Sequence, residues 1–217
     1  MPLTELALLH LKPTITVDNA ALQSSLRSAK HAMESFTGYP FHFFTQVEDP
    51  SYIYIIGNWT SLTQHVDQWI PSEKNQALLE ALENLLTVEW MFHLDIDQLA
   101  TKEGSEGIMP FSAPIVAIVR HFIAAGKKDS FVATFEKNKQ SLVEFTAPQP
   151  ICGGWRIDRE QESGKDGAEK DEFVLFSGWR NIAHHVDFAQ TEPFERYKEI
   201  RDYLAAFEVK HATRWEI

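Results

Sequence analysis

Apolar and polar positions follow one order of elements along the first half of the chain. Short apolar or aromatic runs favour strands, and apolar residues at steps of three and four favour helices. Asp18 and Asn19 can cap the first helix, and Gly38 can end it. The pattern predicts strand, helix, strand, strand, short helix, helix and strand at residues 6–11, 19–37, 41–47, 52–59, 61–69, 72–87 and 87–96.

The second half repeats this order. Its pattern predicts strand, helix, strand, strand, helix and strand at residues 115–122, 130–145, 151–157, 173–179, 193–207 and 209–217. The charged stretch 158–172 contains two glycines and is predicted to be a solvated hairpin loop.

A shared motif supports an internal duplication. Residues 56–67 read IGNWTSLTQHVD and residues 176–187 read FSGWRNIAHHVD, so Trp-x5-His-Val-Asp occurs twice. The apolar steps of the helices before the motif also agree between the halves. We therefore expect two repeats, at residues 1–100 and 114–217, joined by a linker at 101–113.

Each repeat reads β-α-β-β-α-β, the order of ferredoxin-like units. The strands at 41–47 and 52–59 are apolar on both faces, so the face without helices also needs a cover. The sequence predicts an α+β fold in which two ferredoxin-like βαββαβ repeats pack sheet to sheet as an intramolecular dimeric α/β barrel.

Composition and charge narrow the function classes. The 217 residues carry a net charge of −11, which argues against binding to nucleic acid or to an anionic membrane. The single cysteine, Cys152, excludes an intrachain disulfide and a cysteine-based zinc site. With no signal-like N-terminus and no apolar run of membrane-spanning length, we expect a cytoplasmic protein.

The duplicated order and the Trp59-x5-His65 and Trp179-x5-His185 segments resemble the antibiotic-biosynthesis monooxygenase superfamily of dimeric α/β-barrel proteins. This resemblance implies functions that include cofactor-free oxidation of phenolic polyketides, polyketide cyclisation and haem degradation, and it includes proteins without known catalysis. Single-unit members dimerise, so this chain resembles a fused pair.

His65 and His185 are the first candidates for catalysis, because a neutral imidazole can take a proton from a phenol or an enol near neutral pH. The alternative is that each histidine braces its short helix, and retention in both halves favours this structural role. Trp59 and Trp179 can form a wall against an aromatic substrate or, alternatively, pack in the core.

Further candidates lie on the strands. Strand alternation can bring His42, Tyr54 and Asn58 onto one cavity-facing side of the sheet. In the second half, Trp155 can line a pocket and Arg156 can stabilise a developing enolate or phenolate charge. His184, beside His185, is expected to be exposed.

No spacing of histidines suits a metal, and we expect neither a metal nor another cofactor. The predicted helices 72–87 and 193–207 lack the histidine with which haem-degrading relatives hold their iron. The leading hypothesis is a small-molecule enzyme of secondary metabolism, a cofactor-independent monooxygenase or cyclase acting on an aromatic or polyketide-like ligand. The alternatives are a non-catalytic ligand-binding or stress-response protein, and a structural protein with a filled core. A further homodimer stays open.

Overall fold

The computed structural model describes residues 2–100, 108–158 and 171–217. The chain divides into two compact units, of which the first comprises Met1–Gln98 with Ala212–Ile217, and the second comprises Leu99–His211. Most of the predicted linker 101–113 and most of the predicted loop 158–172 lie outside the described residues. At the described ends of that loop, Asp158 pairs with Arg156 and Asp171 pairs with Lys128.

The first unit confirms the predicted order of strands and helices. Asn19 caps the first long helix by accepting from the Leu22 amide, and Gly38 ends it with a φ of 77°. The elements are β1 Leu3–Leu11, α1 Ala20–Thr37, β2 Phe41–Gln46, β3 Tyr52–Trp59, η1 Gln64–Trp69, α2 Glu73–Leu82 and β4 Leu86–Leu94.

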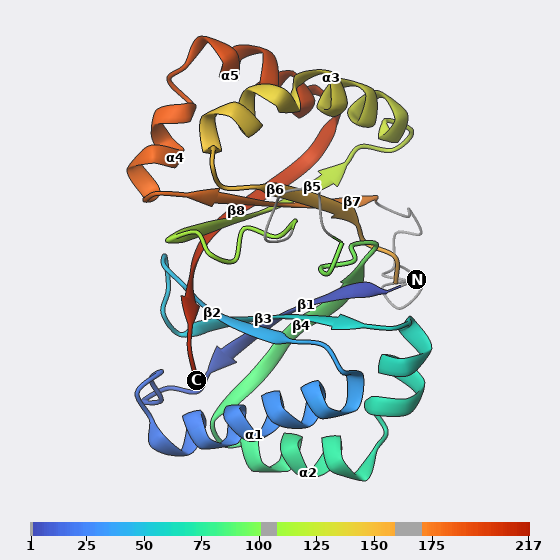
Figure 1. Ribbon diagram of the computed structural model, residues 1–217, viewed down its shortest axis with the longest axis vertical. Coiled ribbons are helices and arrows are strands. Elements are labelled where there is room, and N and C mark those ends of the chain that lie inside the picture. The colour runs from blue at the N-terminus through green and yellow to red at the C-terminus, as the bar shows by residue number, and fades with distance from the viewer. Residues whose placement is uncertain (1, 101–107, 159–170) are drawn as a thin grey trace. The chain divides into compact units, whose positions relative to one another are not determined.

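The sheet of the first unit has the antiparallel strand order β4-β1-β3-β2. Helices α1 and α2 lie on the same face of this sheet (Figure 1). Alternate residues of each strand point to this face, which carries a core of aliphatic and aromatic side chains. Leu22, Leu26, Phe41, Phe43 and Trp59 are among its most deeply buried members.

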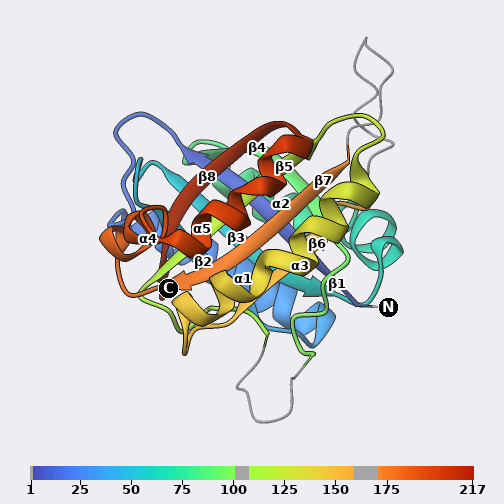
Figure 2. The ribbon, with the colours of Figure 1, turned by 90° about the horizontal axis from the view of Figure 1, so that it is seen from above.

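The second unit also follows the predicted order, with one change near its end. Its elements are β5 Ile115–Ile123, α3 Lys128–Thr146, β6 Ile151–Trp155, β7 Glu172–Trp179, α4 Ile182–Phe188, α5 Glu192–Tyr197, η3 Lys198–Tyr203 and β8 Leu204–Trp215. The strand order is β8-β5-β7-β6, and α3 and α5 lie side by side over the sheet (Figure 2). The core on this face is mainly aromatic and includes Phe131, Phe135, Phe173 and Trp179.

The prediction of a helix over 193–207 is wrong at its C-terminal end. Residues 204–207 belong to β8, which is twelve residues long. The last residues of β8 cross into the first unit, where Ala212–Trp215 pair with β2 in the register Phe43↔Trp215 and Gln46↔Ala212. The fourth strand of the second unit therefore also supplies a strand to the first.

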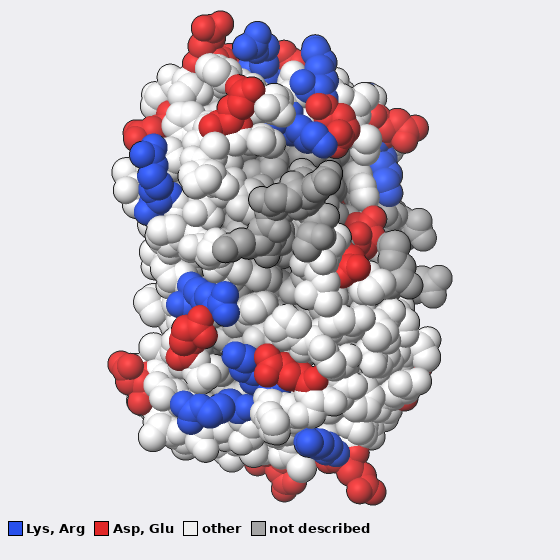
Figure 3. Space-filling view, in the orientation of Figure 1, with Lys and Arg blue, Asp and Glu red and all other residues white. Residues whose placement is uncertain are grey.

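The eight strands form one hydrogen-bonded sheet in the order β4-β1-β3-β2-β8-β5-β7-β6, so β4 and β6 are its edge strands in the described part of the chain. The predicted face-to-face packing of two sheets stays a prediction. On the face of the molecule seen in Figure 3, acidic and basic side chains are interspersed.

Candidate functional site

The helix-covered face of the first unit holds a buried polar cluster of Glu5, Trp59, His65 and His93. Trp59 Nε1 donates a hydrogen bond of 2.6 Å to Glu5 Oε2. His65 Nε2 lies 3.7 Å from the same oxygen, and His65 Nδ1 lies 2.6 Å from His93 Nε2. The rings of Trp59 and His65 stack with centroids 3.9 Å apart. All four side chains are buried, so their partners replace water.

Strand pairing explains why these residues meet. Glu5 of β1 lies opposite Gly57 on β3 and opposite His93 on β4, and all three residues share the helix-covered face. Trp59 follows Gly57 by two residues and therefore points to the same face. The turn after β3 carries the chain back over the sheet, and η1 places His65 above Trp59.

Burial and hydrogen bonding determine the electrostatics of the cluster. Burial raises the pKa of Glu5 above its usual value, while His93 and the hydrogen bond from Trp59 act in the opposite direction. The short contact between His65 and His93 requires that one imidazole nitrogen donates and the other accepts. The arrangement can therefore hold a proton on either ring, close to a carboxyl group.

The predicted short helix at 61–69 is a π-helix. The Ile70 amide donates to the His65 carbonyl, five residues earlier, at 2.9 Å. Single π-turns are rare and frequently occur at functional sites. This wider turn begins at His65, whose side chain belongs to the polar cluster.

The second unit has a related arrangement around Trp179. The ring of His185 stacks on Trp179 with centroids 4.2 Å apart, and His185 Nδ1 lies 2.8 Å from His211 Nε2. Burial, together with His211 and His184, lowers the pKa of His185 to about 4. His185 is therefore neutral at physiological pH.

His184 is buried, which corrects the prediction that it is exposed. Its ring stacks on Phe145 of α3 with centroids 4.8 Å apart and meets Trp179 at 71°. Because Asn181 caps α4 at the His184 amide, the first turn of this helix directs the His184 ring toward the core.

His42, Tyr54 and Asn58 lie on one face of the first sheet, as predicted, but it is the face opposite Trp59 and His65. Tyr54 Oη accepts a hydrogen bond from Gln46 at 3.0 Å, and Asn58 Nδ2 donates to Asp97 at 3.4 Å. Burial and the charge of Arg214 lower the pKa of His42 to about 4. The structure thus divides the predicted residues of this unit between the two faces of the sheet.

Trp155 and Arg156 are adjacent in the chain and point to opposite faces of the second sheet. Trp155 contacts Phe131 and Phe173 on the helix-covered face, and the Lys128 ammonium lies 4.1 Å from its ring centroid. Arg156 pairs with Asp158 and Glu172, each at 3.3 Å.

Glu172 is buried, although it was predicted to belong to the solvated loop. Its other oxygen accepts from Arg120 at 2.5 Å, so this carboxylate receives hydrogen bonds from two guanidinium groups. The charge of Arg156 is therefore compensated within the protein, which weakens its predicted role as an anion stabiliser.

Sequence reasoning missed Glu5 and did not pair His93 with His65. A signal for Glu5 was present, because it alternates with Leu3, Ala7 and Leu9 on the buried face of β1. An acid on such a face needs a partner. The partner itself could not be identified, because it depends on the register between β1 and β4.

The residues present fit a metal or haem poorly. In the described ranges, no group of three or more His, Cys, Asp or Glu side chains is arranged to hold a metal ion. The sequences of α2, α5 and η3 contain no histidine to act as an axial ligand for haem iron. Within the described residues, no helix is both long and apolar enough to cross a membrane.

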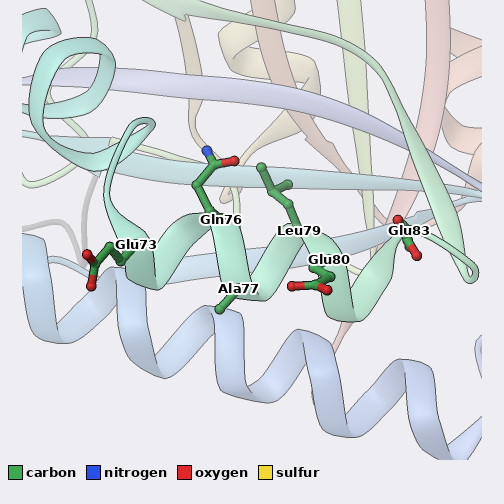
Figure 4. A pocket seen from close by; sticks show the side chains of 6 residues that line it. All are labelled: Glu73, Gln76, Ala77, Leu79, Glu80 and Glu83. Carbon is green, nitrogen blue, oxygen red and sulfur yellow. The ribbon is translucent and has the colours of Figure 1, made fainter.

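An open depression runs along the exposed side of α2 (Figure 4). It includes none of the predicted site residues and is lined by Glu73, Gln76, Ala77, Leu79, Glu80 and Glu83. Three of its six lining residues are glutamates on the solvated side of one helix, so the depression does not form a site with defined chemistry.

No protein-family model matches the sequence, and no curated protein sequence is significantly similar to it. Several solved structures share its fold. An anthrone oxidase-like protein superposes with a TM-score of 0.67 at 11% identity, over 99% of this chain and 92% of that one. A candidate monooxygenase from Fusobacterium nucleatum gives 0.65 at 9% identity, over 99% and 93%.

A chlorite dismutase variant from Candidatus Nitrospira defluvii gives a TM-score of 0.57 at 12% identity, over 99% of this chain and 92% of that one. At such low identity these similarities establish the fold and leave the chemistry to the residues of the site. The chain therefore has the α+β fold seen in structures described as monooxygenase, anthrone oxidase-like and chlorite dismutase proteins.

Proposed function

We propose that the protein is a small-molecule enzyme of secondary metabolism, a cofactor-independent monooxygenase or cyclase that acts on an aromatic, polyketide-like substrate. The observation that carries this proposal is the buried cluster of Glu5, Trp59, His65 and His93. It combines a stacked aromatic ring with acid–base groups in a desolvated environment. The fold shared with anthrone oxidase-like and monooxygenase structures supports the same chemistry by analogy.

In this proposal, an aromatic substrate would approach the cluster at Phe36. This side chain, at the end of α1, is 41% exposed. Its ring centroid lies 5.2 Å from that of Trp69 and 6.4 Å from that of Trp59, and Trp59 stacks on His65. A planar ligand that displaces Phe36 would contact Trp69 and Trp59, and Trp59 in turn stacks on His65.

His65 would act as the general base. It takes a proton from an acidic C–H or O–H of the substrate, and the resulting carbanion reacts with molecular oxygen. For a methylene group between two aromatic rings, loss of water from the hydroperoxide leaves a carbonyl: R₂CH₂ + O₂ gives R₂CO + H₂O. Oxygen is reduced and the carbon is oxidised, so no external electron donor is needed. In a cyclase, the same base would generate an enolate that attacks a carbonyl of the substrate.

We also propose that the two units descend from a duplication and form a fused pair of the dimeric α/β-barrel type. The support is their common strand order, the shared Trp-x5-His motif and the histidine pair that accompanies each tryptophan. The second unit would then be a diverged copy.

A non-catalytic ligand-binding protein is the second candidate. The observation that favours it is the burial of Trp59 and Trp179, each of which is at most 1% exposed and packed among other aromatic rings. In that case, the rings stabilise the fold and a ligand binds without turnover.

The test is oxygen uptake with anthrones and polycyclic phenols, followed by mass spectrometry of the product. We expect a product that has gained one oxygen and lost two hydrogens. His65→Asn should lower kcat by about 10²–10⁴-fold, the usual contribution of a general base. His31→Asn, an exposed histidine on α1, is the matched control. Ligand binding by native mass spectrometry without oxygen uptake or cyclised product would contradict the enzyme proposal and favour the second candidate.

A further inference from the structure

The two tryptophan–histidine–histidine arrangements differ in one strand position. In the first unit, Leu3 lies opposite Trp59, and two residues later Glu5 lies opposite Gly57. In the second unit, Ile115 lies opposite Trp179, and two residues later Ala117 lies opposite Ser177. The same register position thus carries a carboxyl group in one unit and a methyl group in the other.

The acceptor of the tryptophan indole hydrogen bond also differs between the two units. Trp59 Nε1 donates to the Glu5 carboxyl at 2.6 Å, whereas Trp179 Nε1 donates to the Ser177 hydroxyl at 2.9 Å. The neutral hydroxyl satisfies the indole without bringing a charge into the core. The carboxyl also satisfies it, but at the cost of desolvating an ionisable group. A packing role alone would be served by the neutral arrangement.

The type of helix that carries the motif histidine also differs between the two units. His65 lies on the π-helix η1, whereas His185 lies on the α-helix α4. The π-helix also carries Trp69, whose ring centroid lies 6.1 Å from that of Trp59. In the second unit, Phe188 of α4 approaches Trp179 at the same centroid distance, and the His184 ring lies against it as well.

We propose that Glu5 converts the His65–His93 pair of the first unit into an acid–base site, and that the His185–His211 pair of the second unit is a neutral packing element. Glu5 acts as a positioning residue: through Trp59 it fixes the ring on which His65 stacks, and its charge stabilises an imidazolium on His65 or His93. The use of this site in turnover rests on the proposed function, but its protonation behaviour does not.

The groups that face the pair determine its proton affinity. Among the described residues, β1 places the Glu5 carboxyl, β4 places His93 and β3 places the neutral indole of Trp59 against His65. Asp67, on the same π-helix, is exposed. An opposite charge within about 4–6 Å shifts a pKa by about 1–3 units toward the charged form. A Glu5 carboxylate is therefore expected to stabilise the protonated pair more than a neutral residue at this position.

The experiment is an NMR titration of the full-length protein with ¹⁵N-labelled histidine. In the wild type, we expect the His65–His93 pair to take up a proton at a higher pH than His185, for which the pKa is about 4. Glu5→Gln keeps a hydrogen-bond acceptor for Trp59 and removes the charge, so the apparent pKa of the pair should fall by about 1–3 units. The signals of His185 and His211 should not change.

Glu89→Gln is the matched control, because it removes the same charge from a half-exposed position on β4. An unchanged titration of His65 and His93 in Glu5→Gln, or identical titration of the two histidine pairs in the wild type, would overturn the inference. The wild-type comparison needs no substitution, so it decides the question even if Glu5→Gln does not fold. A shifted titration of the His65–His93 pair in Glu5→Gln, together with no oxygen uptake by the wild type, would support the acid–base site. It would contradict the proposal that the protein is an oxygenase.

Discussion

His121 shows how a single buried histidine makes this fold sensitive to acid. It lies on the helix-covered face of β5, 4% exposed, between the rings of Phe131 and Phe173. Burial lowers its pKa to about 4, Arg201 acts in the same direction, and the hydrogen bond with the Phe173 carbonyl opposes them. The neutral ring donates from Nδ1 to that carbonyl at 3.2 Å.

The unfolded chain binds a proton at this histidine near pH 6.5, whereas the folded chain does so near pH 4. The contribution of neutral His121 to the free energy of unfolding is therefore fully present above pH 6.5, and it is lost as the pH falls toward 4. We expect His121→Gln, which keeps a donor for the Phe173 carbonyl, to reduce the loss of unfolding free energy between these pH values by about 3 kcal/mol. Urea unfolding at several pH values measures this slope. His10→Gln, a half-exposed histidine on β1, is the control, and equal slopes in both variants would contradict the prediction.

Individual residues also show how much of the candidate site could be predicted from the sequence. The motif identified Trp59, His65, Trp179 and His185 because their spacing is local. Glu5 could not be joined to them from the sequence, because it lies 54 residues before its hydrogen-bond partner. Only the strand register brings these groups together.

At the scale of elements, local signals placed most boundaries. Asn19 and Gly38 bound α1 as predicted, because capping depends on the residue itself and its immediate neighbours. The helix predicted over 193–207 failed at residues 204–207, where Leu, Ala, Ala and Phe are compatible with a helix. Pairing of β8 within the sheet overrides that local preference.

The cap of α1 gives a prediction at this scale. Asn19→Ala removes the side-chain oxygen that accepts from the Leu22 amide at 3.0 Å. The free energy of unfolding should fall by about 1 kcal/mol, the usual cost of losing such a cap. Chemical denaturation measures the change. Ser24→Ala, at an exposed position within the same helix, should change stability by less than about 0.5 kcal/mol. Equal losses for the two variants would show that the cap is not what stabilises this end.

At the scale of the whole molecule, the chain order and the structural units do not coincide. The last residues of the chain, Ala212–Ile217, belong to the first unit, and Trp215 and Ile217 pack against its core. The sequence predicted a strand here but assigned all of it to the second repeat. The hydrophobic pattern of a strand does not state which neighbour it will pair with.

Removing residues 212–217 should therefore damage the first unit. The deletion takes away the strand segment paired with Phe43–Gln46 and leaves β2 as an edge. We expect backbone amides of β2 to exchange faster with deuterium by about tenfold or more, whereas amides of β6 and β7 keep their wild-type protection. Equal loss of protection in β2 and β7 would mean that the two units unfold together.

The same crossing has a consequence for synthesis on the ribosome. The first 98 residues emerge early, but the segment that completes their sheet, Ala212–Trp215, is translated only after the intervening residues 99–211. Until then, one edge of β2 is unpaired, and this strand contains the aromatic residues Phe41, Phe43 and Phe44. The nascent first unit therefore has an open strand edge until residues 212–215 have left the ribosome and can pair with β2.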